Sequence, residues 1–476
     1  MRAQLLLRLG IVLLIPILTT CSAPSPHKHA EGLDSLECGV VASTTDARCA
    51  NRTPEVSMNP PYRLHFVEFD DQGWLYPDGE ETKYAHQQIE RAIGDIHQRL
   101  AAHERVLLLV FVHGWKHSAE YDDRDVMRFR QMLADAAFLN EQDRPAGGEK
   151  KHSVVGIYVG WRGAGRLSPK NPLVYLSFWT RKNAALHVSE GASRELFARI
   201  RTLRERANSG SPDRPPLRTV VIGHSFGAWI VYSALSPSIF ELLASPLDRD
   251  SSFSLTETES AWHQARLTQA ADMVVLVNPA FEASRYQPIH DVAQRLGRRL
   301  PRYKPPVLIL VTSTADLATR QVFPVGRFFN TIFQVPFVSD EQASAARRTP
   351  GFMASYQTHL LTRRRDVQIG QCHNWKNALP GSESEPARLS RIRTNALAER
   401  QRHAAWSILL TRHHMVLSKG WTWQYCGGAF IKHQRGEPNA PVWNVVTDAS
   451  LIKDHSDIMG EPLHAFLRQL YLDLPR

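Results

Sequence analysis

The sequence predicts an α/β fold with a doubly wound, mostly parallel sheet and helices on both of its faces. Continuous apolar runs, the pattern of strands buried on both faces, alternate with segments of helical periodicity. These runs lie at residues 106–112, 217–222, 273–277 and 306–311. The 476 residues fit one large domain of this class that carries insertions.

The elements predicted before residue 217 follow from composition and periodicity. Residues 22–60 are polar, with Pro24 and Pro26, and predict a tether. The first part of the core, residues 61–317, begins with a strand at 62–69, and 73–76 is a candidate partner strand. A helix is predicted over 84–104, a strand over 154–161, and a long helical stretch from there to Arg206.

The run at 217–222 leads directly into Gly223-His224-Ser225-Phe226-Gly227, and a helical pattern follows at 228–235. A Gly-x-Ser-x-Gly between a strand and a helix indicates a nucleophile elbow. The glycines are needed because a side chain at either position would collide with neighbouring backbone, and the serine must adopt strained φ and ψ. Ser225 is therefore the candidate nucleophile. The alternative is a glycine-rich turn with an idle serine.

Polar loops after the later strands supply candidates for an acid and a base. Asp316 follows the run at 306–311, and Glu282, after the preceding strand, is its competitor. Asp316 could also merely cap the next helix. For the base, His455 lies between a strand at 442–447 and a closing amphipathic helix at 462–472. We prefer it to His464, which lies inside that helix, and to His224, which points away from Ser225.

The run at 106–112 ends in His113-Gly114-Trp115-Lys116. With the elbow downstream, most of residues 60–476 resemble the α/β-hydrolase superfamily. The resemblance implies that the loop after this strand turns its backbone N–H groups toward the substrate oxyanion. The oxyanion donors would be Trp115 and Phe226, and the nucleophile, acid and base would be Ser225, Asp316 and His455. The alternative is that His113 and Gly114 only end a strand.

These residues predict a serine hydrolase that cleaves carboxylic esters through an acyl-enzyme on Ser225, as a carboxylesterase or lipase. A phospholipase or acyltransferase acting on envelope lipids is the alternative within this chemistry. A non-catalytic lipoprotein scaffold with a hydrolase fold is the alternative outside it. We expect no cofactor.

The segment between the acid and the base, residues 318–440, is predicted to form a cap over the active site. Residues 441–476 would then return to the core as its last strand and helix. Within the cap, residues 328–337 are apolar and aromatic. We expect a buried cap segment there, although an acyl pocket or a membrane-facing surface fits the same pattern.

The N-terminus predicts export. Residues 1–21 have a charged start with Arg2 and Arg8 and an apolar stretch too short to span a bilayer. The segment Leu18-Thr19-Thr20-Cys21 resembles a bacterial lipobox, although Thr20 stands where a smaller residue is usual. The resemblance implies a lipidated Cys21 and, with Ser22 next, an outer-membrane lipoprotein on the periplasmic face of the envelope. Cleavage after Ala23 or an uncleaved anchor are the alternatives.

Cysteine usage agrees with export. The four cysteines besides Cys21 are Cys38, Cys49, Cys372 and Cys426. An even number in an oxidising compartment predicts disulfides, and the first two could close a small loop, but three pairings are possible. No cysteine and histidine spacing is typical of zinc, so we expect no metal site.

The charge balance is basic, with 57 Lys and Arg against 47 Asp and Glu, a formal +10. Clusters at residues 298–304 and 363–365 could attract anionic lipid head groups, although arginines that simply solvate the surface explain them more simply. We expect an ester or lipid substrate and the membrane as partners. We expect no nucleic-acid partner, because the predicted hydrolase is exported.

Overall fold

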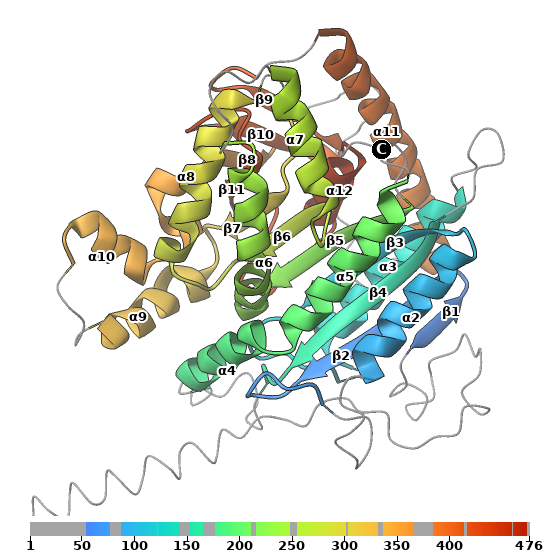
Figure 1. Cartoon of the computed structure of the whole chain (residues 1–476), viewed down its shortest axis with the longest axis horizontal. Coiled ribbons are helices and arrows are strands. Elements are labelled where there is room, and N and C mark those ends of the chain that lie inside the picture. The colour runs from blue at the N-terminus through green and yellow to red at the C-terminus, as the bar shows by residue number, and fades with distance from the viewer. Residues whose placement is uncertain are drawn as a thin grey trace, which may run out of the picture.

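The computed structural model describes residues 54–76, 87–120, 122–142, 152–164, 177–210, 216–247, 255–300, 303–331, 337–364, 384–413, 417–458 and 460–473. Their strands form one eleven-stranded sheet in the order β1-β2-β4-β3-β5-β6-β7-β11-β8-β10-β9 (Figure 1). From β2 to β8 every neighbouring pair in this order is parallel. The sheet is therefore mostly parallel, as predicted.

The parallel strands are β2 (Pro61–Phe69), β4 (His152–Trp161), β3 (Arg105–Val112), β5 (Leu217–His224), β6 (Met273–Val277), β7 (Leu308–Ser313), β11 (Val442–Thr447) and β8 (His359–Arg363). The antiparallel edge strands are β1 (Glu55–Met58) on one side and β10 (Ala429–His433) and β9 (Thr422–Gln424) on the other. Strand β3 lies between β4 and β5, where the strand order reverses. Ligands of open α/β sheets bind at the carboxyl ends of strands beside such a reversal.

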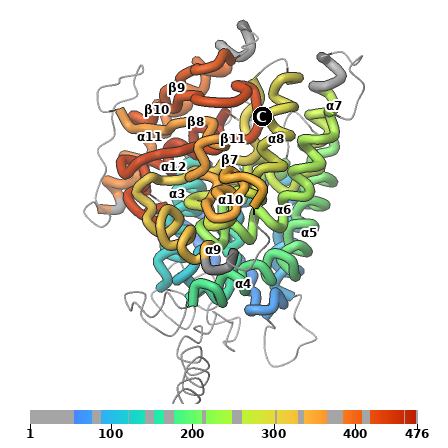
Figure 2. Tube along the Cα trace, turned by 90° about the vertical axis from the view of Figure 1, so that its left-hand side faces the viewer, coloured from blue at the N-terminus to red at the C-terminus, as the bar shows by residue number. Residues whose placement is uncertain are grey.

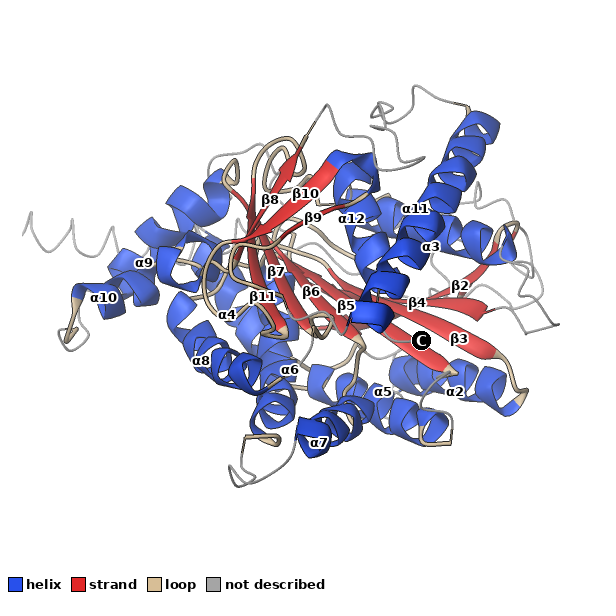
Figure 3. Cartoon of the chain, turned by 90° about the horizontal axis from the view of Figure 1, so that it is seen from above, coloured by secondary structure: helices blue, strands red, loops and turns tan. Residues whose placement is uncertain are grey.

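Helices cover both faces of the sheet (Figure 3). One face is covered by α2 (Gln87–Ala101), α4 (Phe178–Glu190), α5 (Ser193–Asn208), α6 (Phe226–Ala244), α7 (Leu255–Leu267) and α8 (Ala283–Arg299). The other face is covered by α3 (Arg124–Gln142), α11 (Glu385–His413) and α12 (Glu461–Leu472). Each face has its own buried apolar cluster. The long helical stretch predicted to end at Arg206 is two helices, α4 and α5.

Among the described residues, α6 is the helix that is long and apolar enough to cross a membrane, by length and composition. Its most apolar window is 61% buried inside the fold. Because it follows the elbow directly and packs against α4, α5 and α8, it acts here as a core helix.

The prediction that residues 318–440 form a cap is wrong for much of this segment. Strands β8, β9 and β10 extend the central sheet beyond β11, and α11 packs against α3 and α12. Before β8, the described residues of this segment include a helical region made of a turn at Ala318–Val322, α9 (Phe323–Thr331) and α10 (Asp340–Arg347). Figures 1 and 2 show α9 and α10 side by side at one end of the molecule. Short helical turns follow at Pro350–Phe352, Ala354–Tyr356 and Cys426–Gly428.

The prediction of a tether over residues 22–60 is wrong at its end, because Glu55–Met58 pairs with β2. The proposed leader and Cys21 lie outside the described residues, as do Cys38, Cys49 and Cys372. Cys426 is disulfide-bonded, which agrees with the disulfides expected from cysteine usage.

Candidate active site

The turn from β5 into α6 has the strained geometry predicted for an elbow. Ser225 has φ 55° and ψ −117°, an uncommon conformation for a residue with a side chain. A Cβ on Gly223 would lie 2.7 Å from Cα of Ala228, and one on Gly227 would lie 2.3 Å from two carbonyl oxygens at the end of β3. Both glycines are therefore required by the close approach of backbone on either side of Ser225.

The structure brings together the three residues predicted as nucleophile, acid and base. Nε2 of His455 is 2.8 Å from Oγ of Ser225, across 230 positions of sequence. Nδ1 of the same ring is 2.9 Å from Oδ2 of Asp316, so the imidazole faces the carboxylate with one nitrogen and the serine with the other. Asp316 is fully buried and the His455 side chain is 21% exposed. His455 is thus the most open of the three side chains.

Asp316 both starts the helical turn and faces the imidazole. Its carboxylate accepts hydrogen bonds from the N–H of Ala318 at 2.9 Å and of Thr319 at 3.2 Å, and from the Thr319 hydroxyl. Burial acts to raise its pKa, but His455 and the hydrogen bonds from Thr319 outweigh burial and hold the pKa below its usual value. The carboxylate is therefore ionised, and it caps the helical turn while it faces the imidazole.

Glu282, the competing acid, lies elsewhere. It forms a buried ion pair with Lys182, and it contacts Nε of Arg327 at 3.0 Å and of Arg285 at 3.1 Å. Burial acts to raise its pKa, but Lys182 and Arg327 lower it overall. Burial lowers the pKa of Lys182 to about 8. Glu282 thus joins α4, α8 and α9 in an ion cluster, and its ion pairs among the described residues are with Lys182, Arg285 and Arg327 rather than with His455.

His113 does more than end β3. Its Nε2 accepts a hydrogen bond from the N–H of Trp161 at 3.1 Å, so its Nδ1 carries the proton and donates to the carbonyl of Gly114 at 2.9 Å. Burial lowers the pKa of His113 to about 4, which keeps the ring neutral. The histidine therefore orients the backbone of the loop in which Trp115 lies.

That loop packs directly against the elbow. A Cβ on Gly114 would lie 3.0 Å from Cβ of Ser225. The rings of Trp115 and Phe226 are 6.2 Å apart, and the ring of Phe178 contacts both, at 5.8 and 5.3 Å. Phe226 is the first residue of α6, so its N–H belongs to the first turn, whose amides have no acceptor within the helix. Trp115 and Phe226 thus lie close to Ser225 and pack against each other, and their role as oxyanion donors stays a prediction.

Two residues that sequence reasoning did not select hold the loop of the base. Nε2 of His224 is 2.8 Å from the carbonyl oxygen of His455, and Nδ2 of Asn278 donates to the same oxygen at 3.1 Å. Asn278, with φ 46°, also accepts the N–H of Ser313 at 3.0 Å, which ties the ends of β6 and β7 together. Burial lowers the pKa of His224 far below its usual value, so its neutral ring donates through Nε2. A buried histidine in an apolar strand needs a polar partner, and this was the available signal.

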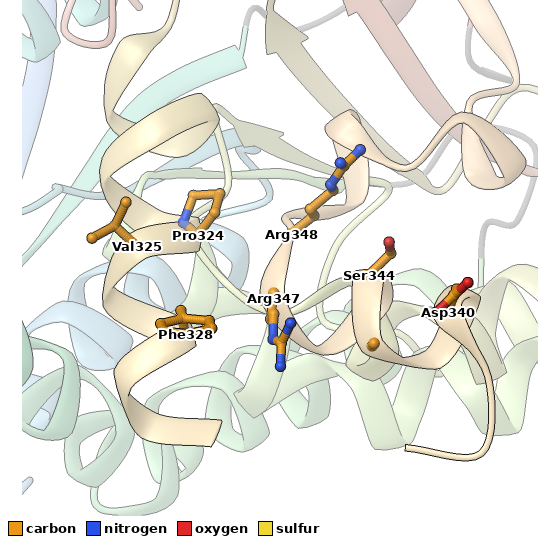
Figure 4. A pocket seen from close by; sticks show the side chains of 8 residues that line it. Pro324, Val325, Phe328, Asp340, Ser344, Arg347 and Arg348 are labelled. Atoms are coloured by element: carbon orange, nitrogen blue, oxygen red, sulfur yellow. The ribbon is translucent and has the colours of Figure 1, made fainter. Parts of the chain in front are cut away.

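The apolar segment that begins at Phe328 was expected to be buried, and this is wrong for the part that is described. Leu317, next to Asp316, is 56% exposed, and Val325 and Phe328 of α9 are 58% and 48% exposed. A groove of about 590 Å³ separates α9 from α10 and is lined by Pro324, Val325, Phe328, Asp340, Ala343, Ser344, Arg347 and Arg348 (Figure 4). The groove has an apolar wall from α9 and arginines from α10.

No protein-family model, curated protein or solved structure matches this chain. The functional assignment therefore rests on the geometry around Ser225.

Proposed function

We propose that this protein is a serine hydrolase of α/β-hydrolase fold that cleaves carboxylic esters through an acyl-enzyme on Ser225. The observation that carries the proposal is the chain of contacts from Ser225 Oγ to His455 Nε2 at 2.8 Å and from His455 Nδ1 to Asp316 at 2.9 Å. A serine in a strained turn, with a base and an ionised carboxylate in line behind it, is the arrangement that nucleophilic catalysis requires.

The reaction begins when the ester carbonyl reaches Ser225. Because Nδ1 of His455 faces Asp316, its proton is held there and Nε2 has a lone pair toward the serine hydroxyl. His455 takes the hydroxyl proton as Oγ attacks, and the imidazolium that forms is stabilised by the Asp316 carboxylate. The new C–O bond gives a tetrahedral intermediate with a negative oxygen.

The intermediate collapses by loss of the alcohol. Its oxyanion is held by the N–H groups of Trp115 and Phe226, each of which contributes on the order of 3 kcal/mol in sites of this type. His455 gives its proton to the leaving alkoxide, and the acyl group stays on Ser225. Water, activated by the same His455, then hydrolyses the acyl-enzyme and restores the serine.

A lipid-like ester is the substrate class that the surface favours. Exposed apolar residues follow the acid directly, at Leu317 and along α9, and the α9–α10 groove adds Arg347 and Arg348 beside them. An acyl chain suits the apolar wall and an anionic head group suits the arginines. Together with the export signal predicted from residues 1–21, this supports a lipase or phospholipase at the periplasmic face of a bacterial envelope.

The proposal is tested by labelling the purified protein with a fluorophosphonate and measuring aryl-ester turnover. We expect wild type and the control Ser233→Ala, which changes a serine inside α6, to be labelled and active. Ser225→Ala should lose both signals, and His455→Ala should lose turnover and label far more slowly. Folded wild-type protein without labelling would refute the proposal and favour a scaffold. Transfer of acyl groups to an added alcohol in preference to water would identify an acyltransferase.

A further inference from the structure

A buried polar cluster lies beside the catalytic residues and has no part in ester cleavage as described. It contains His117 from the loop after β3 and Asp123 and Asp125 at the start of α3, and His224 at the end of β5 lies next to these three. Nδ1 of His117 is 3.1 Å from Oδ1 of Asp123 and 3.7 Å from Oδ2 of Asp125. The same Asp125 oxygen is 3.9 Å from Nδ1 of His224.

The centre of this cluster is unsatisfied. Asp125 and His224 are both fully buried. Among the described residues, the two carboxylate oxygens of Asp125 have no hydrogen-bond partner. The same holds for Nδ1 of His224. Because Nε2 of His224 donates to the carbonyl of His455, its Nδ1 is the unprotonated nitrogen and offers a lone pair. A buried carboxylate and a buried lone pair that face each other without a donor between them call for a bound group.

The loop after β3 packs closely against this cluster. A Cβ on Gly114 would lie 2.7 Å from Nδ1 of His224, so a residue with a side chain would collide with the imidazole. Asp123 is held in place by backbone, since its oxygens accept the N–H groups of Ser118 at 3.1 Å and of Asp125 at 2.8 Å. The donor atoms are thus presented by a rigid frame of a strand end, a loop and a helix start.

We propose that His117, Asp123, Asp125 and His224 bind one divalent transition-metal ion, with zinc as the best fit. Two imidazole nitrogens with two carboxylate oxygens suit zinc better than calcium or magnesium, which prefer oxygen ligands alone. Four donors about 2.0–2.2 Å from a tetrahedral zinc lie about 3.3–3.6 Å from one another. The ligand atoms of His117, Asp123 and Asp125 already lie within 4.8 Å of one another, with separations of 3.1 and 3.7 Å from Nδ1 of His117. Nδ1 of His224 lies 3.9 Å from Asp125, and this side chain has to move toward the other three to complete the geometry.

The ion would connect the loop that contains Trp115 with the loop that contains His455. On one side, His117 belongs to the loop that contains Trp115. On the other, His224 would bind the metal through Nδ1 while its Nε2 N–H holds the backbone of His455. The metal site itself goes beyond the proposed esterase activity, and only this positioning effect rests on it.

The sequence search for zinc ligands considered cysteine and histidine spacing and therefore passed over this set. His117, Asp123 and Asp125 lie within nine residues, but the fourth ligand is about a hundred positions away, which only the neighbouring positions of β3 and β5 in the sheet bring close.

The test is the metal content of the full chain, purified without a metal-affinity tag and analysed by inductively coupled plasma mass spectrometry. We expect about one zinc ion per chain in the wild type and in Asp122→Asn, an exposed neighbour that serves as the matched control. Asp125→Asn keeps the shape of the side chain and should lose at least about nine-tenths of the zinc. Added zinc should raise the melting temperature of chelator-treated wild type and leave that of Asp125→Asn unchanged.

Metal-free wild type that neither binds added zinc nor gains stability from it would overturn the proposal, and so would full zinc occupancy in Asp125→Asn. If Asp125→Asn does not fold, cobalt added to the metal-free wild type decides the matter. The strong visible absorption of four-coordinate cobalt supports the site, and weak bands like those of hydrated cobalt reject it. Ser225→Ala should keep its zinc, so a failure of the esterase proposal and a failure of the metal proposal give different results.

Discussion

Replacement of Asp316 by asparagine tests the residue on which the base depends. Its carboxylate oxygen lies 2.9 Å from Nδ1 of His455, and its side chain is fully buried. Asparagine has the same shape but no charge. Its NH₂ group can face Nδ1 and favour the tautomer with the proton on Nε2, which cannot accept the Ser225 proton.

The expected loss follows from the geometry. Two unit charges about 4 Å apart attract each other by about 4 kcal/mol at an effective dielectric constant of about 20. Because His455 is charged only after it has taken the serine proton, this attraction stabilises the transition state and not the resting enzyme. At about 1.4 kcal/mol for each factor of ten, the substitution lowers kcat by about 10³, and the wrong tautomer lowers it further.

The assay is aryl-ester turnover at saturating substrate, with the concentration of active sites counted by fluorophosphonate titration. KM should change little, since Asp316 is buried behind the imidazole and does not reach the substrate. Asp448→Asn, in the exposed loop after β11, is the matched control and should turn over like wild type. A folded Asp316→Asn protein whose kcat is within about tenfold of wild type would refute the assignment of the acid.

Three further predictions concern the frame around the site. Gly227→Ala should destabilise the protein by about 1–3 kcal/mol and reduce turnover, because its Cβ would lie 2.3 Å from two backbone carbonyl oxygens. The control Gly94→Ala, in α2, adds a Cβ that meets nothing within 4 Å and should stabilise the protein by up to about 1 kcal/mol. Chemical denaturation measures the free energy of unfolding of both variants. Glu282→Gln leaves Lys182 buried without its charged partner and should lower stability by about 3–5 kcal/mol, while kcat stays close to that of wild type. A large loss of kcat at unchanged stability would instead make Glu282 the acid. Between pH 6.5 and pH 4 the unfolded chain binds more protons than the folded one at His113, whose pKa is lowered to about 4 by burial, so the melting temperature should fall as the pH drops through this window. A melting temperature that is constant over that range contradicts the neutral, hydrogen-bonded state described for this ring.

Much of the site could be predicted because its members follow strands that the sequence marks clearly. The runs of β3, β5, β6 and β7 are continuous and apolar, and the residues of interest come directly after them. The resemblance to the α/β-hydrolase superfamily then implied that Ser225, Asp316 and His455 act together, and the carboxyl ends of parallel strands do meet at one edge of a sheet. The elbow adds a local requirement for glycine on both sides of Ser225.

The missed elements depend on distant partners. Strand β8 is only five residues long, and it becomes a strand by pairing with β11 and β10, which begin about seventy or more positions later. So short a pattern does not identify a strand of the central sheet by itself, and the sequence therefore predicted a cap for the whole segment. The supporting role of His224 was missed for the same reason, because its acceptor, the carbonyl of His455, lies 231 positions away.

The sequence by itself determined the α/β class and the glycine-flanked turn at Ser225, because these depend on apolar runs and turns that are local. The proposed order of nucleophile, acid and base came from the resemblance to the α/β-hydrolase superfamily. Only the tertiary structure decided that Asp316 rather than Glu282 meets the imidazole, that β8–β10 extend the sheet, and that His117 and His224 share a buried cluster. These outcomes depend on which strand ends are neighbours and on how deep each charge is buried. Burial and neighbourhood are properties of the packed sheet, and no short stretch of the chain encodes them alone.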